Sequence, residues 1–94
     1  MKELTRGIWL IEKPGEALNI PSGDIIISKY IDENPKYDYA YTAYDISINT
    51  KDTDNISTCY NLEVAQLVAE KIFMNRIEFI ELFHKLKKAT PDGH

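Results

Sequence analysis

Asp24-Ile25-Ile26-Ile27-Ser28-Lys29-Tyr30-Ile31 and Tyr37-Asp38-Tyr39-Ala40-Tyr41-Thr42-Ala43-Tyr44-Asp45-Ile46-Ser47-Ile48 are the two segments that decide the fold. The first is rich in β-branched residues, which fit the pleated surface of a sheet, and the second alternates along its length. Residues 32–36 lie between them and have the composition of a turn, because Pro35 has no backbone N–H and Asp and Asn favour turns. A short strand over residues 56–60 follows a polar loop. Since these loops are too short for crossover connections, residues 24–60 are predicted to form an antiparallel meander.

The residues before this meander also have β character. Residues 7–12 are mostly apolar without interruption, which is typical of a strand buried on both faces. Pro14-Gly15 and Pro21-Ser22-Gly23 are turn signals on either side of residues 16–20. Residues 16–20 are compatible with a short edge strand or with a loop.

Residues 61–88 are predicted to be helical. Asn61 suits the N-cap position, and apolar residues recur at helical spacing from Leu62 to Leu86. One straight helix of this length would run about 40 Å and overhang a small domain. Asn75 and Glu78 resemble a second capping box, which favours a helical pair, or one bent helix, with a break near residues 74–75. A long helix whose overhang is buried in a homodimer is the alternative.

The fold class predicted from these segments is α+β. An antiparallel meander of about four strands precedes a C-terminal helical pair packed on one sheet face. Residues 1–94 form a single domain, β-rich over 1–60 and helical over 61–88, with 89–94 as a flexible tail. The candidate core residues are the large apolar ones, Trp9, Phe73, Phe79 and Phe83.

The composition excludes several classes of protein. The chain is 44% hydrophobic and 28% charged, which is ordinary for a globular domain, and a single cysteine excludes an internal disulfide. No apolar run approaches the roughly 18 residues of a membrane helix. The apolar stretch of residues 8–11 is too short for a signal-peptide core. A cytoplasmic protein without a membrane partner is therefore expected.

Five of the six tyrosines lie between residues 30 and 44. Because strand side chains alternate between faces, Tyr37, Tyr39 and Tyr41 share one face with Asp45. The other face, with Ile46 and Ile48, is more apolar and is expected to pack under the helices. Tyrosine suits an interface, since it combines a large contact area with a polar tip.

The predicted partner-binding residues are therefore the outward tyrosines with their flanking charges, namely Tyr37, Tyr39, Tyr41, Asp38 and Asp45. In the alternative interpretation these tyrosines only cover the sheet and pair across strands. A bulge between Ala40 and Ala43 would also exchange the two faces.

The acidic excess of the chain lies beside these tyrosines. Residues 32–54 hold six acidic and two basic side chains, a net charge of −4. Direct nucleic-acid binding is disfavoured by this charge, whereas an acidic nucleic-acid mimic stays open as a lower-ranked alternative. The short segment Thr42-Ala43-Tyr44-Asp45, with Ser47, resembles part of the phage uracil-DNA glycosylase inhibitors, which are small acidic DNA mimics. The likeness is confined to this segment, and no residue's role is carried over from it.

No catalytic, cofactor or metal site is predicted. Cys59 and His84 lie in no recognisable nucleophile motif, and Cys59 is expected to be a small buried hydrophobe. The two histidines and one cysteine lack zinc-ligand spacing, and the glycines lie too far apart for a phosphate loop.

The function predicted from the sequence is protein binding without catalysis, as in an accessory or inhibitor protein of a phage or mobile element that binds a host protein. The alternative is a small-molecule binding protein, with a nucleotide or metabolite in a pocket between sheet and helices near Trp9 and Tyr60. The sequence leaves a homodimer open.

Overall fold

A computed structural model of the chain describes residues 1–34, 36, 39–51 and 55–89. The described elements, in chain order, are β1 (Lys2–Thr5), β2 (Ile8–Ile11), the 3-10 helix η1 (Pro14–Asn19), β3 (Ile25–Asn34), β4 (Tyr39–Ile48), β5 (Ser57–Cys59), α1 (Leu62–Met74) and α2 (Arg76–Ala89). The predicted α+β class is confirmed, with a sheet first and a helical pair after it. The sheet has five strands in these residues, β1 being the one that the sequence did not reveal.

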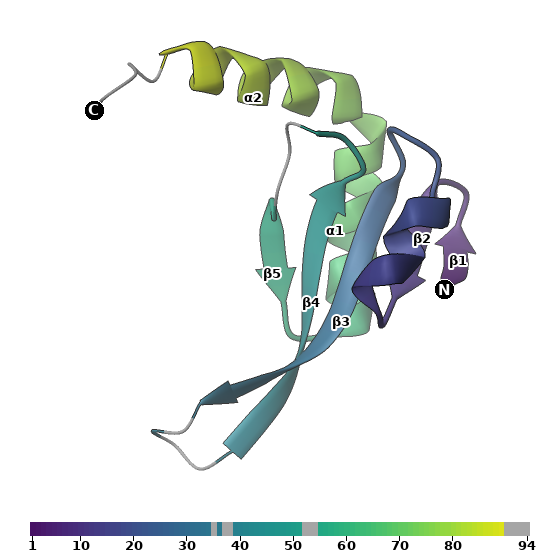
Figure 1. Ribbon diagram of the computed structural model, residues 1–94, viewed down its shortest axis with the longest axis vertical. Coiled ribbons are helices and arrows are strands. Elements are labelled where there is room, and N and C mark those ends of the chain that lie inside the picture. Colours follow the sequence, from purple (N-terminus) through teal and green to yellow (C-terminus); the bar gives the residue numbers. More distant parts are fainter. Residues whose placement is uncertain (35, 37–38, 52–54, 90–94) are drawn as a thin grey trace.

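The strands lie side by side in the order β1-β2-β3-β4-β5, with α1 across one face of the sheet (Figure 1). β3, β4 and β5 form the predicted antiparallel meander. The prediction of a wholly antiparallel sheet is wrong at one place, because β2 and β3 are parallel. The segment between them contains η1, and it returns the chain to the end of the sheet where β2 began. The ambiguous residues 16–20 thus belong mainly to a 3-10 helix, not to an edge strand.

Asn49 fixes this returning segment to the end of β4. Its side-chain amide donates hydrogen bonds to the carbonyl oxygens of Ile20, at 2.6 Å, and Pro21, at 3.2 Å. Its backbone N–H donates to the Asp24 carbonyl at 2.8 Å, and its own carbonyl accepts from Gly23 at 3.0 Å. The chain therefore enters β3 in a position set by contacts with β4.

The β3–β4 pairing has an unbroken register from Ile25 opposite Ile48 to Asn34 opposite Tyr39. No bulge therefore exchanges the faces of β4. The turn predicted over residues 32–36 begins too early, because β3 continues to Asn34. Cross-strand pairing with the start of β4 overrides the turn preference of these acidic residues. Past the ends of β2 and β5, the two strands project as a twisted ribbon, at the bottom of Figure 1.

The main core lies between the sheet and α1. Its largest fully buried side chains are isoleucines from three strands, Ile8, Ile25, Ile27, Ile46 and Ile48. α1 contributes small residues and one isoleucine, namely Ala65, Ala69 and Ile72. The small side chains let the helix backbone approach the sheet closely. Of the predicted aromatic core, Phe73 and Phe79 are half-buried and only flank this cluster.

A second, smaller cluster lies on the opposite face of the sheet, under η1. It consists of the buried residues Ile11, Ile20 and Ile26, with Trp9 and Ala17 packed against them. The Trp9 indole N–H also donates to the Asp24 carboxylate, at 3.0 Å. Since Ile8 belongs to one cluster and Ile11 to the other, the predicted burial of this strand on both faces is confirmed.

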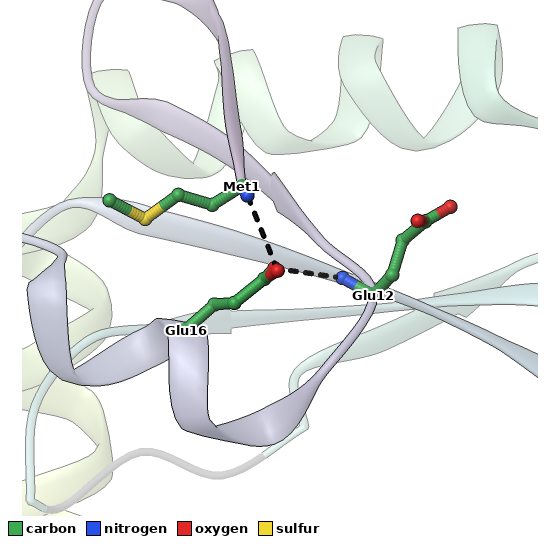
Figure 2. A network of polar contacts seen from close by, with 3 residues as sticks. All are labelled: Met1, Glu12 and Glu16. Atoms are coloured by element: carbon green, nitrogen blue, oxygen red, sulfur yellow. Dashed lines mark hydrogen bonds and ion pairs between the residues drawn. The ribbon is translucent and has the colours of Figure 1, made fainter.

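Glu16 of η1 ties the 3-10 helix to the first two strands (Figure 2). Its carboxylate accepts a hydrogen bond from the backbone N–H of Glu12, at 3.2 Å, and lies 3.4 Å from the α-amino group of Met1. The hydrogen bond from Glu12, together with the amino group, lowers the pKa of the Glu16 carboxyl below its ordinary value.

The helical region divides where the sequence predicts. Asn61 is the N-cap of α1, and its side chain accepts a hydrogen bond from the Val64 N–H at 3.1 Å. Asn75 separates the two helices and lies at the predicted N-cap position of α2, because its backbone carbonyl accepts a hydrogen bond from the Phe79 N–H at 3.1 Å. Its side-chain amide donates to the Lys71 carbonyl, at 2.9 Å, and so completes the end of α1.

The break does not remove the predicted overhang, because α2 itself extends past the sheet at the top of Figure 1. The radius of gyration is 14.5 Å, against about 12 Å for a compact chain of this length. The principal extents are 40 × 36 × 24 Å. The projecting ribbon and the projecting helix lie at opposite ends of the longest axis.

The contact between Gly7 and Phe73 yields a stability prediction. Gly7 has a φ of +81°, and a Cβ there would overlap the Phe73 ring of α1. Gly23 also has a positive φ, of +90°, but has open space around it, and Gly15 has open space without a positive φ. We expect Gly7→Ala to lower the free energy of unfolding most and Gly23→Ala to lower it by about 1–2 kcal/mol. Gly15→Ala should change it by less than about 0.5 kcal/mol.

Urea unfolding of the three variants measures this order. Equal losses for Gly7→Ala and Gly23→Ala would show that Phe73 does not pack over the β1–β2 turn.

Candidate functional site

The face of the sheet that α1 leaves uncovered carries a group of tyrosines. Tyr30 comes from β3, Tyr41 and Asp45 from β4, Thr58 from β5, and Tyr60 directly follows β5. We call this set the tyrosine face. The exposed fractions of the three tyrosines are 40%, 43% and 61%, in chain order. Register brings the set together, because Tyr30 lies opposite Ala43 and Asp45 lies opposite Thr58.

Asp45 is the polar centre of the tyrosine face. One of its carboxylate oxygens accepts hydrogen bonds from the Tyr30 hydroxyl, at 3.2 Å, and from the Thr58 hydroxyl, at 2.8 Å. The Asn55 amide in turn donates to the Thr58 hydroxyl at 2.8 Å. These bonds connect β3, β4 and the residues around β5, and they hold the carboxylate in one orientation.

The tyrosine rings border two hollows in the surface. Tyr41 and Tyr60 meet edge to face, with ring centroids 5.9 Å apart, a geometry that aromatic pairs prefer. A hollow of about 360 Å³ adjoins this pair. A second hollow, of about 250 Å³, lies where Tyr30 meets the start of η1, and it is bordered by Lys13 and Lys29. Each hollow is wide enough to accept a side chain from another molecule.

The environment of Tyr30 changes its acidity. Desolvation raises the pKa of the Tyr30 hydroxyl above the ordinary value, and the negative charge of Asp45 and the hydrogen bond to it raise it further. Asp32 contributes in the same direction. Tyr30 therefore stays neutral, and remains a hydrogen-bond donor, over the whole physiological pH range.

The structure gives the positions of two of the five predicted partner-binding residues. Tyr41 and Asp45 lie together on the tyrosine face, turned away from α1. Tyr37 and Asp38 lie outside the described residues, and Tyr39 is described only as the first residue of β4.

Sequence reasoning missed three members of this face, Tyr30, Thr58 and Tyr60. Alternation within a strand shows only which residues of that same strand share a face. Only the pairing of β4 with both flanking strands shows that Tyr30 and Thr58 meet Asp45 and that Tyr60 meets Tyr41. The signal for Tyr30 lay in the length of the β3–β4 loop, which sets the register.

The remaining candidate residues form no site with one another. Cys59 is free and buried in the main core, as predicted, whereas His84 lies exposed on α2. Among the described residues, no group of three or more His, Cys, Asp or Glu side chains is arranged to hold a metal ion. Within the same residues, neither helix combines the length and the apolar character needed to cross a membrane.

Comparisons with protein families, with curated proteins and with solved structures gave no match to this chain. The tyrosine face therefore has to be interpreted from its own geometry.

The bonding of Tyr30 predicts a measurable titration. We expect Tyr30 to ionise above about pH 10, the ordinary tyrosine value. Because the folded pKa is raised, the stability linked to this group is present below the unfolded pKa and is lost as the pH rises through the folded pKa. Asp45→Asn should lower the Tyr30 pKa part of the way back, since the charge disappears and the desolvation remains.

An NMR titration of the Tyr30 ring carbons measures both values. Asp32→Asn is the matched control and should lower the pKa less, because Asp32 is the weaker of the two influences. An unchanged Tyr30 titration in Asp45→Asn would contradict the bond between them.

Proposed function

We propose that this chain is a small, non-catalytic protein-binding module and that the tyrosine face is its contact surface. The observation that carries the proposal is that three exposed tyrosines lie on one sheet face with an oriented carboxylate, to which Tyr30 donates a hydrogen bond. Tyrosine is enriched at the energetically dominant positions of protein interfaces. We also propose, from the small size and the acidity of the chain, that it is an accessory protein of a phage or mobile element.

The arrangement favours binding because much of it is ordered before a partner arrives. The Tyr41–Tyr60 ring contact and the Tyr30–Asp45 hydrogen bond restrict side chains that would otherwise lose freedom on binding. Preorganisation of this kind lowers the entropic cost of association. The two hollows beside the rings offer places for a partner's anchor residues.

The charge of the surface indicates the chemistry of the partner. Residues 32–54 carry a net charge of −4, and the Asp45 carboxylate lies on the tyrosine face. A basic partner surface would complement this charge and would be attracted to it from a distance. Arginine is the side chain best suited, since a guanidinium pairs with a carboxylate and also stacks on an aromatic ring.

The sequence-based alternative is a small-molecule pocket between sheet and helices near Trp9 and Tyr60. These two residues do not lie between the sheet and the helices. Trp9 packs beneath η1, and Tyr60 contacts Tyr41, so both lie on the face opposite α1. Small-molecule binding would therefore have to use the hollows of the tyrosine face. Thermal stabilisation by a nucleotide or metabolite in the absence of any protein would favour this alternative.

Site-specific photocrosslinking tests the proposal. Ser47 lies two residues after Asp45 on β4 and therefore on the same face of the sheet. A photoreactive amino acid at Ser47 should capture a protein partner from the native host. The same label at Leu18, which is 90% exposed on η1, is the control and should capture none. Capture from Ser47 should disappear in the Tyr41→Ala/Tyr60→Ala double variant.

Binding of the purified partner gives the magnitude. Truncation of two anchor tyrosines should raise the Kd at least about tenfold, with an unchanged thermal unfolding curve. Wild-type affinity in the folded double variant would show that the tyrosine face is not the contact surface.

A further inference from the structure

The second helix carries an apolar stripe that its own domain covers only in part. Phe79, Leu82 and Leu86 follow the three- and four-residue spacing of one helix face. Phe79 packs against the main core, together with Ile80. Leu82 and Leu86 lie further along the same stripe, and their exposed fractions are 50% and 53%. The main core thus covers the stripe at Phe79 but leaves it half exposed at Leu82 and Leu86.

The total surface of the chain is consistent with a patch of this kind. The chain exposes 6802 Å², whereas a compact monomer of its mass exposes about 5,500 Å². A specific protein interface buries about 800 Å² on each partner. The projecting β3–β4 ribbon and the projecting α2 both contribute to the excess of about 1,300 Å², and an interface on α2 would remove part of it.

The charges beside the stripe are distributed by sign along the helix. Glu78 and Glu81 occupy the first two turns of α2, and Lys85 and Lys88 occupy the last two. Arg76, at the start of the helix, donates to the Phe73 carbonyl and lies over the Phe73 ring. The helix dipole alone favours this order, but it gives no reason for half-exposed leucines among these charges. A basic surface helix for membranes would instead carry lysines along the whole polar face.

We propose that α2 packs antiparallel against α2 of a second copy of this chain, with Leu82 and Leu86 at the centre of the interface. Antiparallel packing sets the acidic half of each helix beside the basic half of the other, twice by symmetry. A parallel arrangement would set like charges together. The 14-residue helix is about 21 Å long, so the interface spans roughly four helical turns.

The dimer would leave the tyrosine face accessible. α2 lies at the end of the long axis opposite the β3–β4 ribbon (Figure 1). The register places the tyrosines on the sheet face turned away from α1. Self-association and partner binding thus use separate surfaces, and each can fail without the other.

Sedimentation equilibrium of the full chain tests the proposal. The wild type should have twice the monomer mass of 10.8 kDa at micromolar concentration. The Leu82→Gln/Leu86→Gln variant should be monomeric and retain its helical circular dichroism. Leu67→Gln is the matched control, since Leu67 is 64% exposed on α1, and its mass should equal that of the wild type. A monomeric wild type, or a dimeric Leu82→Gln/Leu86→Gln variant, would overturn the proposal.

Charge exchange tests the antiparallel orientation. Glu78→Lys/Glu81→Lys and Lys85→Glu/Lys88→Glu should each weaken the dimer, because each places like charges in contact. An equimolar mixture of the two variants should regain the dimer mass, since every contact across the interface is then between opposite charges. Two variants that each dimerise as well as the wild type would show that the orientation is wrong, and a mixture that stays monomeric would show that these side chains do not meet across an interface.

Discussion

The antiparallel pairing of β3 with β4 is the constraint on which the rest of the structure depends. Its register runs without a shift along ten residues of each strand. Since side chains alternate, this register decides which residues face α1 and which face away. Ile27 and Ile46 lie opposite each other in the core, whereas Tyr30 lies opposite Ala43 on the other face. A slip by one residue would bury the tyrosines and expose the isoleucines.

The two faces of this sheet are covered differently, and their surfaces follow from that difference. α1 covers one face with small residues such as Ala65 and Ala69, which allow close packing. On the other face, η1 covers only the part around Ile11 and Ile26. The part beyond η1 holds the tyrosine face, where rings and hydroxyls interact with one another and with Asp45. The exposed aromatic surface thus results from a cover that is shorter than the sheet.

Some of these features were predictable from the sequence because they depend on neighbours in the chain. Alternation and β-branched composition identified the long strands, and helical spacing with Asn61 identified the start of α1. Tyr41 and Asp45 were placed on the correct face of β4. The prediction failed where contacts between distant residues decide. Residues 32–34 form part of β3 because β4 pairs with them, and the Asn75 side chain donates back to the Lys71 carbonyl although Asn75 precedes α2.

The sequence by itself determined the α+β class, the order of the main elements and the two faces of β4. Each of these follows from apolar residues that recur every two residues in a strand or every 3.6 residues in a helix. Only the tertiary structure decided the parallel pairing of β2 with β3, the meeting of Tyr30 and Thr58 at Asp45, the contact of Tyr60 with Tyr41, and the projection of α2 past the sheet. These depend on which strands become neighbours and in which register. Hydrogen bonds and packing between residues far apart in the chain fix that choice, and no local pattern records it.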